Sequence, residues 1–442
     1  MALTDRYGLP ISTSSAAAAE RFQDGMDRLL SYGPGAEESF AAALEADEGL
    51  AVAHAGVALL AVGRGDAATA RAAAGRARDA VAGASRRERQ HVEALSALIG
   101  GETAHGLALV DEHVAEFPRD ALLVNQAGSA IGFAGGRDRE EHRAAFLERL
   151  APAYGDDWWF QSALAFTYHE LDRFEESRRL SERSLQQYPG NANASHNIAH
   201  ICFETVDTDA GVAFLEEWMS GYDARASFHC HLAWHLAMFE LQRGRHARAL
   251  EVFHRDIVGA VNPRLAMVDG SALLWRFRLD GRPAEPEAWR RLAELAGRVS
   301  RPGFVFGEVH AALAYAACGD GAALAKLSDG LRALGEKGHP IAGSVAHPLV
   351  QGIAAFAAGD YTGALGHFES VEAEVHRIGG SHAQWELYEE TMVACYLALQ
   401  RYDDADRLVR RRLQRRASPR DLGWLDQATA GLAAQSRTAG AS

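Results

Sequence analysis

The sequence predicts an all-α fold in which paired helices stack into one repeat array, a solenoid. Almost every segment longer than ten residues spaces its apolar residues with a helical period, and the alternation typical of strands is nearly absent. Glycine-containing turns such as Gly65-Asp66, Gly319-Asp320 and Gly359-Asp360 separate these segments. A similar pattern also recurs along the 442 residues, so we expect repeats. The chain is long enough to bury a large core.

The clearest repeat runs from Trp158 to Asn191. Its first helix carries a large-small pair, its second helix carries a small residue where the two helices cross, and a proline closes the unit. These marks are Leu164-Ala165, Tyr168, Phe174, Ser177 and Pro189. The spacing is typical of a tetratricopeptide repeat, in which small residues let two antiparallel helices approach closely.

Further copies extend this pattern over most of the chain. They are recognised at Ala36–Asp47, at Leu236-Ala237 with Gly244, Ala249 and Phe253, and at Ala355 with Gly359-Asp360-Tyr361, Ala364 and Phe368. We therefore expect a single α-solenoid over residues 1–434 with a concave inner pocket. The period breaks near residues 258–286, which predicts an irregular insertion, and the small polar residues 435–442 predict a disordered tail.

Composition restricts the classes of partner. The chain has 45 Lys and Arg against 59 Asp and Glu, a formal charge of −14, which disfavours broad electrostatic binding of nucleic acid or an anionic membrane. The first fifteen residues contain no apolar signal core, and the four cysteines follow no disulfide or zinc-ribbon spacing. We expect a cytoplasmic protein that binds neither nucleic acid nor membrane.

The 19 histidines are unevenly distributed, and two pairs stand out. His196 and His200 are four residues apart, so they share one helix face, and Glu204 continues that face by one turn. His231 and His235 repeat this spacing 35 residues later, close to one repeat length. Since packed helices lie roughly 8–10 Å apart, we expect the two pairs to face each other from the first helices of adjacent repeats.

A further candidate segment surrounds His382. Gly379-Gly380 predicts a helix break, with Ser381 as the N-cap of the next helix. His382 and Gln384 then lie in the first turn, where backbone N–H groups favour an anion or a carboxylate. We also single out residues that would hold or enclose an acidic ligand, namely Trp275, Arg276 and Arg377.

The chain resembles the tetratricopeptide repeat protein 38 family over nearly its whole length. The resemblance is carried by Arg87-Glu88-Arg89-Gln90-His91-Val92, the two histidine pairs, Leu273-Leu274-Trp275-Arg276 and Gly379-Gly380-Ser381-His382-Ala383-Gln384. The family pattern continues the last motif with Arg and Asp, whereas Trp385 and Glu386 stand here. The resemblance implies an all-helical solenoid.

Two catalytic alternatives arise from the histidines. In the first, a divalent transition metal is bound by His196, His200, His231, His235 and Glu204 and activates water or a carbonyl. In the second, no metal is present and His231, His235 and His382 act as general acid and base. His196, His200, Glu204, Trp275, Arg276, Arg377, Ser381 and Gln384 then bind the ligand. Against both stands a structural alternative in which the histidines fill polar positions between helices.

The main functional hypothesis is an enzyme that acts on a small polar molecule in a histidine-lined pocket, by acid/base or metal-assisted chemistry. The alternative is a non-catalytic scaffold that binds a peptide or protein in its groove, and the acidic balance favours a basic peptide. The arginine run Arg410-Arg411-Arg412 to Arg415-Arg416 is interpreted as a solvated helix face rather than a phosphate site.

Overall fold

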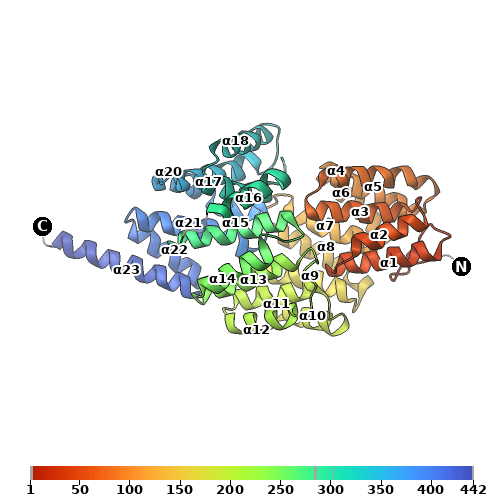
Figure 1. Cartoon of the computed structure of the whole chain (residues 1–442), viewed down its shortest axis with the longest axis horizontal. Helices are drawn as coiled ribbons and strands as arrows, with labels where there is room; N and C mark the ends of the chain where they lie inside the picture. Colours follow the sequence, from red (N-terminus) through yellow and green to blue (C-terminus); the bar gives the residue numbers. More distant parts are fainter. Residues whose placement is uncertain (1–2, 283–285, 301, 441–442) are drawn as a thin grey trace. The chain divides into compact units, whose positions relative to one another are not determined.

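The protein is helical nearly throughout, as expected (Figure 1). The computed structural model describes residues 3–282, 286–300 and 302–440. Among these residues the only β-type pairing is an isolated antiparallel bridge between Thr4 and Pro10. None of the described helices is both long enough and apolar enough to span a membrane.

The chain folds into two compact units. The first comprises Met1–Ile198 with Gly221–His229, and the second comprises Ala199–Ser220 with Cys230–Ser442. The boundary runs through helix α11 (Ala192–Glu204), which therefore contributes residues to both units. The expectation of one continuous array over residues 1–434 stays a prediction.

The first unit is built from consecutive antiparallel helix pairs. The closest packing joins α1 with α2, α3 with α4, α5 with α6, and α9 with α10. Its helices are α1 (Ala16–Ser31), α2 (Ala36–Ala46), α3 (Ala51–Arg64), α4 (Ala67–Ala80), α5 (Arg86–Gly100), α6 (Thr103–Glu116), α7 (Ala121–Phe133), α8 (Arg139–Tyr154), α9 (Trp158–Glu170), α10 (Phe174–Gln187) and the first half of α11.

The second unit continues with helices of more varied length. It includes two π-helical turns, Phe253–Ile257 and Ala342–Ala346, and a 3₁₀ segment, Glu372–Ile378. Its α-helices after α11 are α12 (Thr208–Met219), α13 (His229–Gln242), α14 (His246–Val252), α15 (Pro263–Leu279), α16 (Pro286–Val299), α17 (Val305–Cys318), α18 (Gly321–Glu336), α19 (His347–Ala357), α20 (Tyr361–Glu369), α21 (His382–Ala398), α22 (Tyr402–Arg415) and α23 (Pro419–Gly440).

The glycine-aspartate turns form as the sequence predicts. Gly65 ends α3 in the left-handed region at φ 83°, a conformation that glycine adopts without steric cost. Asp66 then caps α4, because its carboxylate accepts a hydrogen bond from the Thr69 N–H at 3.0 Å. Gly359 and Asp360 repeat this arrangement between α19 and α20. These turns fix the reversal between two paired helices.

The predicted repeat from Trp158 to Asn191 is confirmed as the α9–α10 hairpin. The two helices approach so closely that Ser177 Oγ on α10 donates to the carbonyl oxygen of Ala165 on α9 at 2.7 Å. Both residues are fully buried. The small residues at the crossing therefore have the role that the repeat pattern assigns them, and the all-α helical-hairpin fold of the tetratricopeptide type is confirmed.

Two expectations about irregular segments need correction. Residues 263–279 form the long helix α15 rather than an irregular insertion, because Asn262 caps it and Pro263 occupies its first position. The stretch 435–440 continues helix α23, and Gln435 Nε2 donates to the carbonyl oxygen of Gln400 at 3.1 Å. Residues 283–285 of the expected insertion and 441–442 of the expected tail lie outside the described residues.

Candidate functional site

Three of the four paired histidines meet in the second unit. The ring centroids of His200 and His235 are 4.4 Å apart at an interplanar angle of 70°, and those of His231 and His235 are 5.0 Å apart at 81°. The three side chains are buried, with exposed fractions of 1%, 6% and 0% for His200, His231 and His235. The expectation that histidines on α11 and α13 face each other is confirmed.

Spacing along the two helices explains this cluster. His231 and His235 lie one turn apart on α13, so both project from the same face. That face meets the part of α11 that belongs to the second unit, where His200 lies. We name His200, His231 and His235 the histidine triad.

A buried carboxylate supports one member of the triad. Asp269 on α15 places its Oδ2 at 2.8 Å from His231 Nδ1, and its side chain is fully buried. Burial raises the pKa of Asp269 above the usual value, and the charge and hydrogen bonds of His231 oppose that rise. Gln384 on α21 also lowers the pKa of this carboxyl group. The contact between Asp269 and His231 thus links α15 to α13.

His196 belongs to the first unit, one turn before His200 along α11. Its ring stacks on Phe166 at a centroid distance of 5.6 Å and meets the edge of Phe228 at 5.1 Å. The side chain is 4% exposed. His196 is therefore a buried residue packed between aromatic rings of its own unit.

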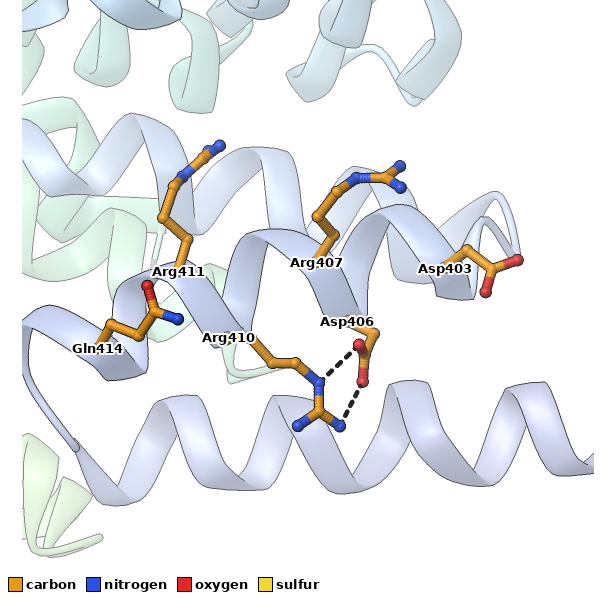
Figure 2. A pocket seen from close by; sticks show the side chains of 6 residues that line it. All are labelled: Asp403, Asp406, Arg407, Arg410, Arg411 and Gln414. Carbon is orange, nitrogen blue, oxygen red and sulfur yellow. Dashed lines mark hydrogen bonds and ion pairs between the residues drawn. The ribbon is translucent and has the colours of Figure 1, made fainter.

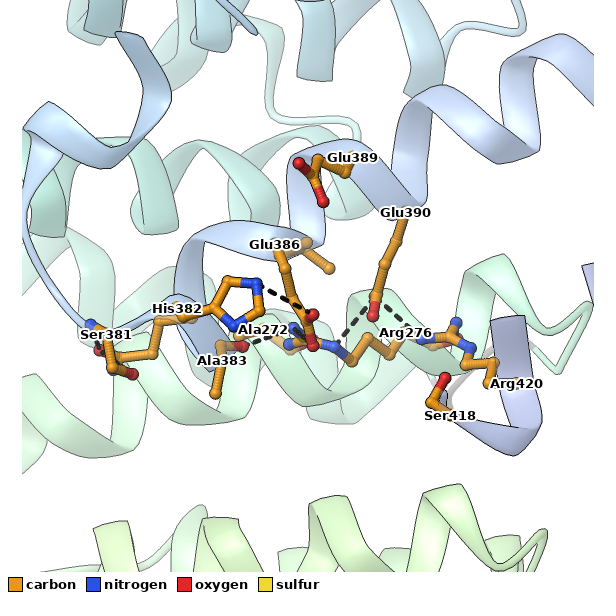
Figure 3. Close-up of polar contacts among 12 residues, drawn as sticks. Ala272, Arg276, Ser381, His382, Ala383, Glu386, Glu389, Glu390, Ser418 and Arg420 are labelled. Atoms are coloured by element: carbon orange, nitrogen blue, oxygen red, sulfur yellow. Dashed lines mark hydrogen bonds and ion pairs between the residues drawn. The ribbon is translucent and has the colours of Figure 1, made fainter. Parts of the chain in front are cut away.

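Glu204 and His382 form a separate polar pair in the second unit. His382 Nδ1 lies 2.9 Å from Glu204 Oε1, and its Nε2 lies 3.6 Å from Glu386 (Figure 3). Burial would raise the pKa of Glu204, but His382 and Arg416 outweigh it and hold the pKa below its usual value. The Glu204 carboxylate is therefore engaged by His382 and Arg416, outside the triad.

Ser381 begins helix α21 as predicted. Gly379 and Gly380 have positive φ angles of 95° and 75°, so the backbone turns before the helix begins. Gln384 Oε1 accepts the Ser381 backbone N–H at 3.1 Å, which is the return half of a capping box. Ser381 and Gln384 are 4% and 7% exposed. Their first role is to fix the start of α21.

Arg276 and Trp275 lie in the interior of the second unit. Arg276 is fully buried, donates to the Ala383 carbonyl oxygen at 2.7 Å, and places its Nε 3.0 Å from Glu390 (Figure 3). Trp275 Nε1 donates to Thr391 Oγ1 at 3.0 Å. Both side chains thus link α15 to α21.

Arg377 is partly buried next to its own segment. Its Nη1 lies 2.6 Å from Glu374 Oε2, three residues earlier in the 3₁₀ segment. A ligand carboxylate or phosphate at Arg377 would have to compete with this local ion pair. The predicted anion-binding role of Arg377 stays a prediction.

The arginine run on α22 is less exposed than expected. Arg410 pairs with Asp406, and both line a shallow open depression on this helix (Figure 2). The interpretation as a wholly solvated face is wrong for Arg412 and Arg416, which are 3% and 5% exposed. These two pair with buried and partly buried carboxylates from other helices, which offset the cost of burying a guanidinium. Their partners include Glu386, Glu389 and Asp421.

The first unit contains a second histidine cluster that sequence reasoning did not identify. His91 Nδ1 and His113 Nε2 each lie 3.0 Å from Asp120, and Arg87 Nε lies 2.7 Å from the same carboxylate. All four residues are at most 2% exposed. We name Arg87, His91, His113 and Asp120 the aspartate cluster. The four-residue spacing of Arg87 and His91 was the available signal, because it places both on one face of α5.

The triad has a restricted chemical repertoire. Neutral imidazoles that face each other donate and accept protons or coordinate a transition metal. The closely packed rings form no described pocket, so the histidine-lined pocket for a small molecule stays a prediction. The Asp269 carboxylate contacts the triad through His231 Nδ1.

Comparison with known proteins supplies no family. No family profile matches the chain. One solved structure with some likeness is the human IFIT1 dimer with m7Gppp-AAAA, at 15% sequence identity and a TM-score of 0.43, covering 92% of this chain and 95% of that chain. The APC/C hetero-tetramer Cut9-Hcn1 has 12% identity and a TM-score of 0.39, covering 86% of this chain and 77% of that chain. Yeast Tom70 has 13% identity and a TM-score of 0.32, covering 95% of this chain and 96% of that chain. TM-scores below 0.5 carry no inference about function. The resemblance to the tetratricopeptide repeat protein 38 family stays a prediction.

Proposed function

We propose that the protein is a non-catalytic scaffold that binds a basic polypeptide segment. The observation that supports it is the distribution of acidic residues. Residues 1–200 contain 29 Asp and Glu against 19 Arg and Lys, whereas residues 201–442 contain 30 against 26. Most of the excess negative charge therefore belongs to the first 200 residues, and a basic segment is attracted there.

Within residues 1–200, the acidic excess is most concentrated at α2 and the turn that follows it. Residues 36–50 contain five acidic residues and no Arg or Lys. Four of the acidic side chains are exposed, namely Glu37, Glu38, Glu45 and Glu48. Arg64 pairs with Glu37 from α3, which leaves the net charge of this surface negative. We name these four glutamates the α2 acidic surface.

The contacts of Arg276 and His382 with carboxylates of the second unit favour a scaffold over an acid/base enzyme. An enzyme that binds an anionic substrate needs cations directed at that substrate, yet Arg276 and His382 are engaged by carboxylates of the same unit. A helical-repeat scaffold has no such requirement, because it recognises an extended partner through its surface.

Binding of a labelled peptide tests the proposal. A fluorescent peptide rich in Lys and Arg should raise its anisotropy on addition of the full chain, and its affinity should fall steeply as salt rises from 50 to about 200 mM because the contacts are exposed. A peptide of equal length with Glu in place of each basic residue should not bind. Equal binding of both peptides, or no binding of the basic one, would overturn the proposal.

A charge-matched pair of variants locates the contact. Replacing the α2 acidic surface by glutamine should weaken binding of the basic peptide about tenfold or more. The control replaces four exposed acidic residues of the second unit, Glu287, Glu294, Asp329 and Glu336, and should retain most of the affinity. If the control weakens binding as much as the test variant, the effect is net charge alone and the assigned surface is wrong. Displacement of the peptide by single-stranded RNA would also contradict the proposal.

A further inference from the structure

We propose that His200, His231 and His235 bind one divalent transition-metal ion inside the second unit. This inference is independent of the proposed scaffold function. It concerns a site that holds α11, α13 and α15 together rather than a surface that meets a partner. The three residues come from two helices, and one of them is oriented by a carboxylate from a third.

The distances within the triad suit a metal ion. Each histidine offers a ring nitrogen, and these nitrogens lie within 4.8 Å of one another. In tetrahedral zinc sites the Zn–N bonds of 2.0–2.1 Å place two ligand nitrogens about 3.3 Å apart. Since 4.8 Å is the upper limit of these separations, each pair of nitrogens has to approach by about 1.5 Å at most, which rotation about side-chain bonds can provide.

The hydrogen bond to Asp269 prepares His231 for coordination. A proton held on Nδ1 by the carboxylate leaves the lone pair of the ring on Nε2. Pairing of a carboxylate with the far nitrogen of a metal-bound histidine is a common arrangement, since it fixes the ring and increases its basicity. Asp269 is itself fully buried on α15, which limits its movement.

The donor set indicates the class of metal. Three imidazole nitrogens are the ligands preferred by Zn²⁺, Co²⁺, Ni²⁺ and Cu²⁺, whereas Mg²⁺ and Ca²⁺ prefer oxygen. The Asp269 carboxylate offsets part of the positive charge that such an ion brings into a buried site. Glu204, which the sequence suggested as a ligand, is instead paired with His382. A water molecule would complete a tetrahedral shell around three histidines.

A cobalt titration tests the site. The full chain, produced without a histidine tag and stripped of metal, should bind one Co²⁺ per chain and develop the visible absorption typical of tetrahedral cobalt. One equivalent of Zn²⁺ should then remove that absorption. Absence of stoichiometric binding, or only weak binding of several ions at surface histidines, would overturn the proposal.

One variant and a matched control test the assignment of the ligands. His235→Gln should lower the affinity for Co²⁺ at least 100-fold. His310→Gln is the control, because His310 is equally buried in the same unit but bonds the Phe306 carbonyl oxygen through Nδ1 at 2.8 Å, and it should bind within threefold of the wild type. Equal affinity in His235→Gln would contradict the assignment.

Asp269→Asn keeps the proposal testable if the histidine variant does not fold. Its side chain has nearly the same size, and the histidine ligands remain in place. Loss of the carboxylate should weaken Co²⁺ binding 10- to 100-fold while the far-ultraviolet circular dichroism of the apo chain is unchanged. An unchanged cobalt affinity would show that Asp269 does not support a metal ligand, and the proposed site would be wrong.

Discussion

The aspartate cluster of the first unit and the histidine triad of the second use the same residue types in opposite ways. In the aspartate cluster the carboxylate of Asp120 lies within 3.0 Å of His91, His113 and Arg87. In the triad the rings contact each other, and the carboxylate of Asp269 lies against Nδ1 of His231. The position of the carboxylate determines whether buried histidines bind an internal anion or remain directed at one another.

The two carboxylates also differ in their electrostatic environment. Burial would raise the pKa of Asp120, but Arg87 and the two histidines outweigh it and hold the pKa well below its usual value. The pKa of Asp269 is raised, because burial exceeds the stabilisation from His231. Asp120 is therefore an anion neutralised by fixed protein cations. Among the described residues no arginine is paired with Asp269, so an added cation would stabilise its carboxylate.

Removal of Asp120 should have the largest effect on stability. Asp120→Ala leaves Arg87 as a buried cation without its closest anion, which costs about 3–5 kcal/mol of unfolding free energy. Urea denaturation followed by circular dichroism measures the loss. Asp120→Asn should be nearly as damaging, because an amide keeps the shape but not the charge. A loss below about 1 kcal/mol in both variants would show that the cluster contributes little to folding.

Glu308 tests the opposite case, a buried carboxylate without a cation. It accepts the Gly303 N–H at 3.0 Å, and burial raises its pKa to about 7. A raised folded-state pKa means that its contribution to stability is complete below the unfolded value of about 4.5 and is lost as the pH rises through about 7.

Glu308→Gln removes this titration and keeps an acceptor for Gly303. The free energy of unfolding of the variant minus that of the wild type should therefore rise by about 3 kcal/mol between pH 4.5 and pH 8. Denaturant titrations of both proteins at the two pH values provide the measurement. A difference that does not change with pH would contradict the view that partners decide the ionisation of these buried acids.

Arg410 provides the smallest expected effect and a surface reference for Arg87. It pairs with Asp406 one turn earlier on α22, and its own side chain is 58% exposed. Water already stabilises both charges, so Arg410→Ala should leave the denaturation midpoint within experimental error. A clear loss of stability would mean that ion pairs on this helix surface matter as much as buried ones.

Local patterns predicted much of the fold and part of the site. The α9–α10 hairpin follows from small residues such as Ala165 and Ser177, whose spacing allows two helices to approach. The four-residue spacing of His231 and His235, and its recurrence one repeat after His200, placed the triad correctly, because both features depend only on helix geometry.

Long-range contacts could not be predicted in this way. Arg276 looked like a ligand-binding residue, yet it meets Glu390, which is more than a hundred residues later in the chain. The partner of His231 is Asp269, and that of His382 is Glu204. No periodic signal connects such residues, since their contacts depend on how α11, α15 and α21 pack. The division into two units within α11 likewise leaves no mark in the sequence.

Anomalous diffraction at the zinc absorption edge tests the central contrast most directly. Crystals of the full chain grown with one equivalent of Zn²⁺ should show one strong anomalous peak, about 2 Å from nitrogens of His200, His231 and His235. The aspartate cluster should show none, because Arg87 already neutralises Asp120. A peak at the aspartate cluster, or no peak at the triad, would contradict the conclusion that carboxylate placement separates a closed ion-pair cluster from a metal site.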